Sequence, residues 1–262
     1  MLRLGVAVQC AALAWLALRH GTSLDTLLFS ELGTSEAAAL AADRVLAAAV
    51  ALAAAALLFR PLGSAAGVVA LAFLLVAVAT RLGGARPFAD LSPLAHANRW
   101  LAPLAIAVLW GGLRPAEEPS GKRVRAGLWV LRCAVAATFL AHGWQALGHH
   151  PAFVDLLIGT ARRWTDTAPP ETTAHLVLNL IGAMDVAVAV LLLAARWPGV
   201  ALWAAAWGLA TLASRTVALG TEFLHESLIR AMNALAPLAL WLLWRAEAAA
   251  PPTPPPRCTR SS

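Results

Sequence analysis

The stretch LVLNLIGAMDVAVAVLLLAA, residues 176–195, is twenty residues long and contains a single ionisable side chain, Asp185. About 20 mostly apolar residues are enough for a helix to cross the ~30 Å hydrocarbon core of a bilayer. The rest of the chain is similar, since 60% of its 262 residues are hydrophobic, 13% are charged, and the mean hydropathy is +0.71. Soluble domains have about 45–50% apolar and about 25% charged residues. This composition excludes a water-soluble enzyme and a disordered chain, and three cysteines are too few for a disulfide scaffold.

Eight segments are apolar and long enough to predict membrane spans, so the expected fold is an all-α, polytopic membrane bundle of eight transmembrane helices. The segments are 2–18, 37–59, 62–80, 97–113, 127–147, 176–195, 198–219 and 228–244. The first also has the form of a signal peptide, but its counterpart later in the chain favours a membrane span.

That counterpart belongs to an internal duplication. The matching stretches are Leu101-Ala-Pro-Leu-Ala105 with Leu235-Ala-Pro-Leu-Ala239, Ala79-Thr-Arg81 with Ala213-Ser-Arg215, and Leu2-Arg3 with Leu131-Arg132. We therefore expect a first four-helix repeat at 1–113, a cytoplasmic linker at 114–126, a second four-helix repeat at 127–247 and a disordered cytoplasmic tail at 248–262. Four spans are an even number, so both repeats enter the membrane from the same side and are parallel.

The positions of the basic residues predict the orientation of the protein. One side of the eight-span topology carries both termini and collects most arginines of the short connections, among them Arg60 and Arg196. By the positive-inside rule this side is cytoplasmic, so we expect a multi-pass protein of the cell membrane. The one basic cluster, Lys122, Arg123 and Arg125, is expected in the linker loop. Scattered basic residues predict the lipid bilayer as the partner and no nucleic acid.

Asp185 is the most informative polar residue of the spans. It lies 11 residues from Arg196, about 16 Å along a helix, and so near the membrane midplane. An acid at this depth is costly and usually has a partner. We expect it within salt-bridge or hydrogen-bond reach of at least one of four groups: His142, Arg215, Arg230 and Asn233. The candidate ligand-binding residues are His142, Asp185, Arg215, Glu226, Arg230 and Asn233.

Other readings of these residues stay open. Asp185 and an arginine form either a site or a clasp that only fixes helix packing. His142, Gln145 and His149 share one face of the fifth span. Trp203 and Trp207 are interpreted as a packing or lipid-facing stripe. No paired Glu-x-x-His motif accompanies the Glu222–His225 spacing, so no metal site is expected.

The first repeat keeps the pattern but loses most polar groups. Arg81 corresponds to Arg215, whereas Leu13 stands in the place of His142. Two registers are open for Asp43, since matching the flanking arginines places it opposite Asn179 and matching the motifs places it opposite Asp185.

Two motifs of the second repeat carry a family resemblance. They are Arg132-Cys-Ala-Val-Ala-Ala-Thr-Phe139-Leu-Ala-His142-Gly143, and Gly182-Ala-Met-Asp185 followed by Leu191-Leu-Leu193. This pattern resembles the four-helix DoxX-like family of integral membrane proteins. The resemblance implies respiratory or thiol redox chemistry, in some members as a quinone-linked oxidoreductase subunit, with a quinone as the cofactor and other membrane or redox subunits as partners.

Three functions therefore compete, and the sequence leaves open whether the protein is an enzyme. In a quinone-binding subunit, His142, Arg215 or Arg230 would hydrogen-bond the quinone carbonyls and Asp185 would accept a proton. In a transporter of small molecules or lipids, an Asp185–Arg215 pair would act as a gate. The third function is that of a structural or assembly subunit of a membrane complex.

Overall fold

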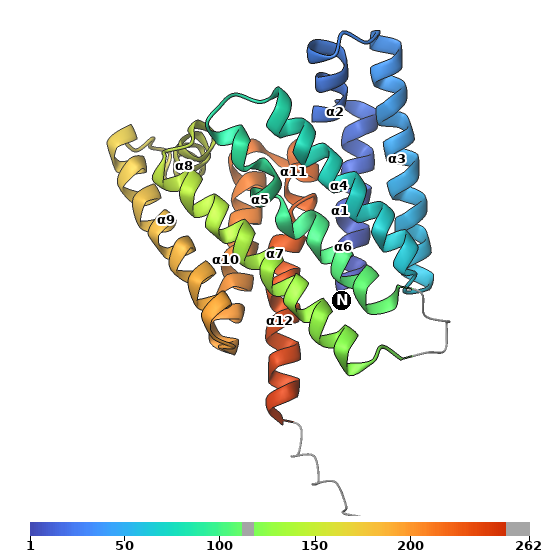
Figure 1. The fold of residues 1–262 in the computed structure, drawn as a ribbon. Coiled ribbons are helices and arrows are strands. Elements are labelled where there is room, and N and C mark those ends of the chain that lie inside the picture. Colours follow the sequence, from blue (N-terminus) through green and yellow to red (C-terminus); the bar gives the residue numbers. More distant parts are fainter. Residues whose placement is uncertain (112–117, 250–262) are drawn as a thin grey trace, which may run out of the picture.

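The computed structural model describes residues 1–111 and 118–249, and every regular element within these ranges is a helix (Figure 1). The long helices are α1 (Leu2–Arg19), α3 (Glu36–Phe59), α4 (Gly63–Gly83), α6 (Ala97–Trp110), α7 (Gly121–Leu147), α8 (Pro151–Thr165), α9 (Glu171–Ala194), α10 (Pro198–Leu219) and α12 (Met232–Ala249). The short ones are α2 (Ser23–Thr26), η1 (Leu27–Glu31), η2 (Phe88–Leu91), α5 (Ser92–Ala95), η3 (Thr221–Phe223) and α11 (Leu224–Leu228).

The expected membrane character is confirmed by the length and hydropathy of these helices. Among the described residues, six helices are long and apolar enough to cross a bilayer: α1, α3, α4, α7, α9 and α10. A seventh span arises only if α12 is joined to the segment Thr221–Leu228, from which it is bent by 44°. Helix α6 has 14 residues, about 21 Å, which is shorter than the hydrocarbon core. Helix α6 starts at the expected residue 97, whereas the break before α12 moves the start of the eighth expected span from 228 to 232.

The long helices pack in the same order in both halves of the chain. Helix α3 packs on α1 and α6 on α4, and in the second half α9 packs on α7 and α12 on α10. Helices α6 and α12 each follow a short broken segment and each contain an internal proline, Pro103 and Pro237. Extensive packing of α6 on α7 joins the two halves. In Figure 1 the N-terminus and the end of α12 both lie toward the lower side.

Two arginines make the same contact in the two halves. Arg3 of α1 donates a hydrogen bond to the carbonyl of Leu57, close to the end of α3, at 3.5 Å. Arg132 of α7 is buried and donates to the carbonyls of Leu192, Leu193 and Ala195 at the end of α9. The last carbonyls of a helix lack partners within it, so each arginine caps the second long helix of its own half.

The expected boundaries of the linker and the tail need correction. Helix α7 begins at Gly121, so Lys122, Arg123 and Arg125 are helical and are not in a loop. Lysine, arginine, alanine and leucine are good helix formers, and Arg123 donates a hydrogen bond to the carbonyl of Gly111. Helix α12 continues to Ala249, two residues into the expected tail. The expectations for 112–117 and 250–262 lie outside the described residues.

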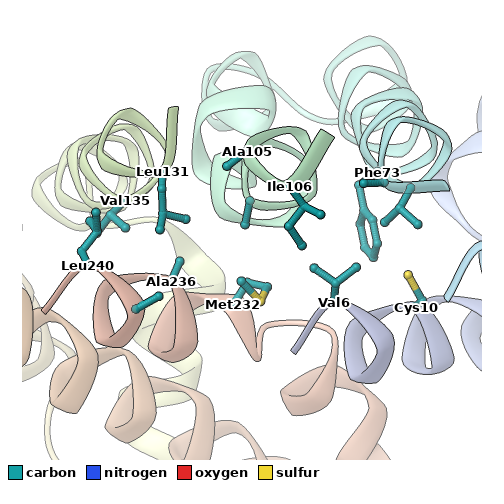
Figure 2. Close-up of a cluster of buried hydrophobic side chains, with 14 of the residues drawn as sticks. Val6, Cys10, Phe73, Ala105, Ile106, Leu131, Val135, Met232, Ala236 and Leu240 are labelled. Atoms are coloured by element: carbon teal, nitrogen blue, oxygen red, sulfur yellow. The ribbon is translucent and has the colours of Figure 1, made fainter. Parts of the chain in front are cut away.

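The apolar core lies where helices of both halves meet (Figure 2). Side chains from α1, α4, α6, α7 and α12 contribute to it, and most of them are completely buried. The labelled members are Val6, Cys10, Phe73, Ala105, Ile106, Leu131, Val135, Met232, Ala236 and Leu240. Cys10 is completely buried among these apolar side chains and so contributes to packing.

Close packing of α7 on α9 depends on two glycines. A Cβ atom at Gly182 would lie 2.7 Å from the carbonyl oxygen of Gly143, and a Cβ atom at Gly143 would lie 2.9 Å from that of Gly182. Small residues at such crossings let the backbones of membrane helices approach closely. This contact fixes the position of α9, which carries Asp185.

We expect Gly182→Ala to destabilise the protein by about 1–3 kcal/mol, because the added methyl group meets backbone that cannot move aside. The measurement is thermal unfolding of the purified protein in detergent. Gly67→Ala is the matched control, since a Cβ atom there has no neighbour within 4 Å. Equal melting temperatures for the two variants would contradict this account of the α7–α9 contact.

Candidate functional site

A cavity of about 480 Å³ lies in the second half of the protein. Helix α9 packs mainly on α7 and α10 packs mainly on α12, so α9 and α10 diverge, and α8 packs on both. The lining residues come from α7, α8, α9, α10 and the start of α12: His142, Ala146, Phe153, Leu156, Leu157, Thr160, Ala161, Trp164, Leu178, Ile181, Asp185, Trp207, Ala210, Thr211, Ser214, Arg215, Arg230 and Asn233. Its volume is typical of small-molecule sites, which range over about 300–1,000 Å³.

Helix α8 forms one wall of the cavity and was absent from the sequence prediction. Its lining residues recur at spacings of three and four, from Phe153 through Leu157 to Trp164, whereas Asp155 and Arg162 are exposed. This amphipathic pattern is the sequence signal that could have predicted α8. A search for spans misses it, because a helix of 15 residues with one apolar face is typical of the membrane interface.

Helix α8 begins immediately after His150, which is half-buried. The His150 ring accepts a hydrogen bond from the backbone N–H of Ala152, and Pro151 occupies the first helical position, where its missing N–H costs nothing. Burial is the main cause that lowers the pKa of His150, and the positive charge of Arg215 lowers it further. His150 is therefore expected to be neutral at physiological pH, as its role in accepting this hydrogen bond requires.

The cavity brings together five of the six residues that the sequence suggested as a ligand site. His142 comes from α7, Arg215 from the last turns of α10, and Arg230 and Asn233 from the break before α12 and its first turn. Asp185 of α9 lines the same cavity. The sixth, Glu226, is no lining residue but forms an ion pair with Arg230.

The ion pair between Arg230 and Glu226 fixes the arginine at the edge of the cavity. Its Nη1–Oε2 distance is 2.6 Å, and the two side chains are 17% and 29% exposed. Arg230 also donates to the Glu226 backbone carbonyl. The helix is broken between α11 and α12, so Glu226 lies in α11 and Arg230 in the break, within the expected eighth span, and the two side chains remain in contact.

The prediction that Asp185 pairs directly with one of the four expected groups is also wrong. Asp185 is 5% exposed, and among the described residues it forms no salt bridge with His142, Arg215 or Arg230. Its carboxylate lies beside the indole of Trp207, and its Oδ1 atom has no hydrogen-bond partner within the described part of the chain. Trp207 therefore faces the cavity, whereas Trp203 is exposed, as a lipid-facing stripe requires.

Asp185 forms no salt bridge with Arg215 because the two residues lie at different distances from the helix ends on this side of the bundle. Asp185 lies 14 residues, about 21 Å, from the start of α9. Arg215 lies four residues, about 6 Å, from the end of α10 on the same side of the bundle. Arg215 therefore lies nearer this end of the bundle than Asp185, which lies beside Trp207.

Two polar residues expected on one face of the fifth span, Gln145 of α7 and His149 two residues beyond its end, do not line the cavity. Gln145 donates to the carbonyl of Phe88 in the first half at 3.3 Å. His149 hydrogen-bonds Asn179 at 3.0 Å and stacks on His175 with a centroid distance of 4.1 Å. Of the expected polar face of α7, only His142 lines the cavity.

Two first-half positions that the sequence match pairs with cavity residues hold apolar side chains. Leu13, matched to His142, and Phe73, matched to Trp207 by the same offset as the Ala-Pro-Leu stretches, are buried in the core. Arg81, which corresponds to Arg215, is exposed and lies 3.7 Å from Asp90. Asp43 accepts two hydrogen bonds from Thr22 near the start of α3, which agrees with the register opposite Asn179 better than with the one opposite Asp185.

Within the described ranges, no group of three or more His, Cys, Asp or Glu side chains is placed to hold a metal ion. Comparisons with protein-family models, with curated proteins and with solved structures found no match to this chain. The cavity and the charges around it are therefore the basis on which its function is inferred.

Proposed function

We propose that this integral membrane protein binds an amphipathic molecule, taken up from the bilayer, in the cavity between α8, α9 and α10. One observation carries the proposal: a cavity with apolar walls from three helices is also lined by the polar side chains of His142, Arg215, Arg230 and Asn233. Ligand sites combine apolar walls with a few convergent polar groups in this way. An amphiphile fits both parts of the cavity. A purely polar solute would make no favourable contacts with the apolar walls, and a hydrocarbon would form no hydrogen bonds with the arginines.

The proposal includes a duplicated architecture of two parallel, four-helix DoxX-like repeats, with α6 and α12 as the fourth and eighth spans. The capping contacts of Arg3 and Arg132 and the breaks before α6 and α12 support it. Within this architecture the first repeat is a scaffold, and the second carries the site.

A quinone-linked redox subunit is the second candidate, and Asp185 favours it. A quinone also has an apolar body and a polar head, and its carbonyls accept hydrogen bonds from His142 and Arg215. Asp185, buried beside Trp207 with one oxygen unpartnered in the described part of the chain, is placed to exchange a proton with such a head. The transporter hypothesis requires an Asp185–Arg215 pair as its gate, and the described residues do not form this pair. No observation favours the hypothesis of an assembly subunit.

We expect Ala210→Trp to remove most of the bound amphiphile, because Ala210 lines the cavity and an indole would fill it. The measurement is mass spectrometry of lipophilic molecules released from protein purified in mild detergent. Ala206→Trp is the matched control, since Ala206 is exposed one turn earlier on α10 and does not line the cavity. If both variants release the same molecules in the same amounts as the parent, the cavity is not the binding site.

The proposed orientation has the N-terminus and the start of α7 in the cytoplasm and α8 on the outer side. In a variant without native cysteines, Thr165→Cys should react with an impermeant maleimide added to intact cells, and Ser120→Cys should react only after lysis. Both positions are exposed. The reverse labelling pattern would overturn the orientation.

A further inference from the structure

The charges at the outer end of the cavity do not balance. Arg99, Arg215 and Arg230 are close enough for their charges to interact, and Glu226 is the acid that interacts with them. Glu226 is already paired with Arg230 at 2.6 Å. Arg99 and Arg215 form no ion pair with any residue that the structure describes.

Both of these guanidinium groups are held inside the protein. Arg99 is 8% exposed and enters the cluster from the first half, at the start of α6. Arg215 is partly buried and lines the cavity. Charged side chains at membrane depth are expensive and normally have a partner. Arg99 and Arg215 are therefore expected to be neutralised by a negative charge that the described residues do not supply. The cavity is the open space in which such a charge can bind.

The groups beside Arg215 suit an oxyanion. A guanidinium presents several N–H donors in a planar fork that matches a carboxylate or a phosphate. His142 and Asn233 line the same cavity and add side-chain donors. Arg230 remains occupied by Glu226. Arg215 is thus the primary contact, and Arg99, which does not line the cavity, adds positive potential from the other half.

We infer that the ligand is a single-chain amphiphile with an anionic head, a carboxylate or a phosphate monoester. The inference rests on the proposed function and specifies its ligand class. The head lies against Arg215, His142 and Asn233, and the chain follows the apolar wall of Leu157, Ile181 and α8. An inorganic anion would leave that wall unused, and a neutral quinone would leave both arginines without a counter-charge.

The experiment compares three probes with the same chain: oleate, oleyl phosphate and oleyl alcohol. Their binding to the protein in nanodiscs of zwitterionic lipid is measured by displacement of a fluorescent fatty acid. We expect at least one anion to bind at least about tenfold more tightly than the alcohol, because hydrogen bonds to a charged group contribute about 1.5–3 kcal/mol. The tighter anion identifies the head as a carboxylate or a phosphate.

Variants connect the preference to Arg215. Arg215→Gln should weaken anion binding at least about tenfold and leave oleyl alcohol unchanged, whereas Arg215→Lys should retain part of the preference. Arg81→Gln, the corresponding change in the first half, should have no effect, since Arg81 is exposed beside Asp90. If alcohol and anions bind equally and Arg215→Gln changes neither, the anionic head is wrong while amphiphile binding stands. If no probe binds and Ala210→Trp has no effect on bound lipid, the proposed function itself fails.

Discussion

Glu226→Gln is expected to destabilise the protein by about 3 kcal/mol, because it leaves three neighbouring arginines without an acid among the described residues. The pair with Arg230 is close, at 2.6 Å, and neither side chain is more than a third exposed. Removing one partner of a buried ion pair costs about 3–5 kcal/mol, since the remaining charge stays desolvated, and partial exposure places this pair at the lower end. The measurement is the melting temperature in detergent.

Glu222→Gln is the matched control. Glu222 is exposed in the same short segment and forms no salt bridge within the described ranges, so its melting temperature should stay at the parent value. The same Glu226→Gln variant should bind oleate or oleyl phosphate more tightly than the parent, because the cluster gains net positive charge. A variant as stable as Glu222→Gln would show that the arginines need no counter-ion.

Asp43→Ala is expected to cost about 2–4 kcal/mol, since it leaves two buried donors of Thr22 without an acceptor. Asp43 is completely buried and accepts from the Thr22 backbone N–H at 2.6 Å and from its hydroxyl at 2.7 Å. This contact holds the start of α2 against α3. The measurement is again thermal unfolding in detergent.

Graded variants separate this contact from a general loss of packing. Asp43→Asn keeps one acceptor and should fall between the parent and Asp43→Ala. Thr22→Ser keeps both donors and should be nearly neutral, whereas Thr22→Val loses only the hydroxyl. If Asp43→Ala, Asp43→Asn and Thr22→Val melt together with the parent, the two hydrogen bonds contribute nothing to stability.

Hydropathy was sufficient to predict a helical membrane protein, and the depth of polar residues was sufficient to select five residues of the cavity lining. His142, Arg215, Arg230 and Asn233 were grouped because expensive side chains in neighbouring spans tend to face one interior. The same reasoning failed to identify the neighbour of Asp185, since it assumed straight spans of equal depth. Trp207, which lies beside Asp185, was interpreted as part of a packing or lipid-facing stripe because an apolar ring gives no sign in the sequence of which way its N–H points.

The break near the start of the eighth span was not predicted from the sequence, whereas the fourth span was expected to begin at residue 97, where α6 begins. Hydropathy does not reveal the break after Leu228, because the residues around Ile229 are not polar enough to end an apolar segment. What bends the chain there is tertiary contact: the Asn98 N–H donates to the Thr138 hydroxyl of α7 at 3.0 Å, and the Ser227 hydroxyl donates to the Leu212 carbonyl of α10 at 2.8 Å. Both contacts join segments far apart in the sequence, so local patterns do not reveal them.

The capping contacts of Arg3 and Arg132 also set an order of assembly. Each arginine reaches the end of the next long helix in its own half, so each half can lock its first hairpin before the other half is inserted. The cationic cluster is different, because Arg99 belongs to the first half and Arg215 to the second. Its counter-charge site exists only after the halves have docked through α6 and α7. Under the proposed function, ligand capture would follow docking of the halves, and an occupied cavity would mark a completely assembled molecule.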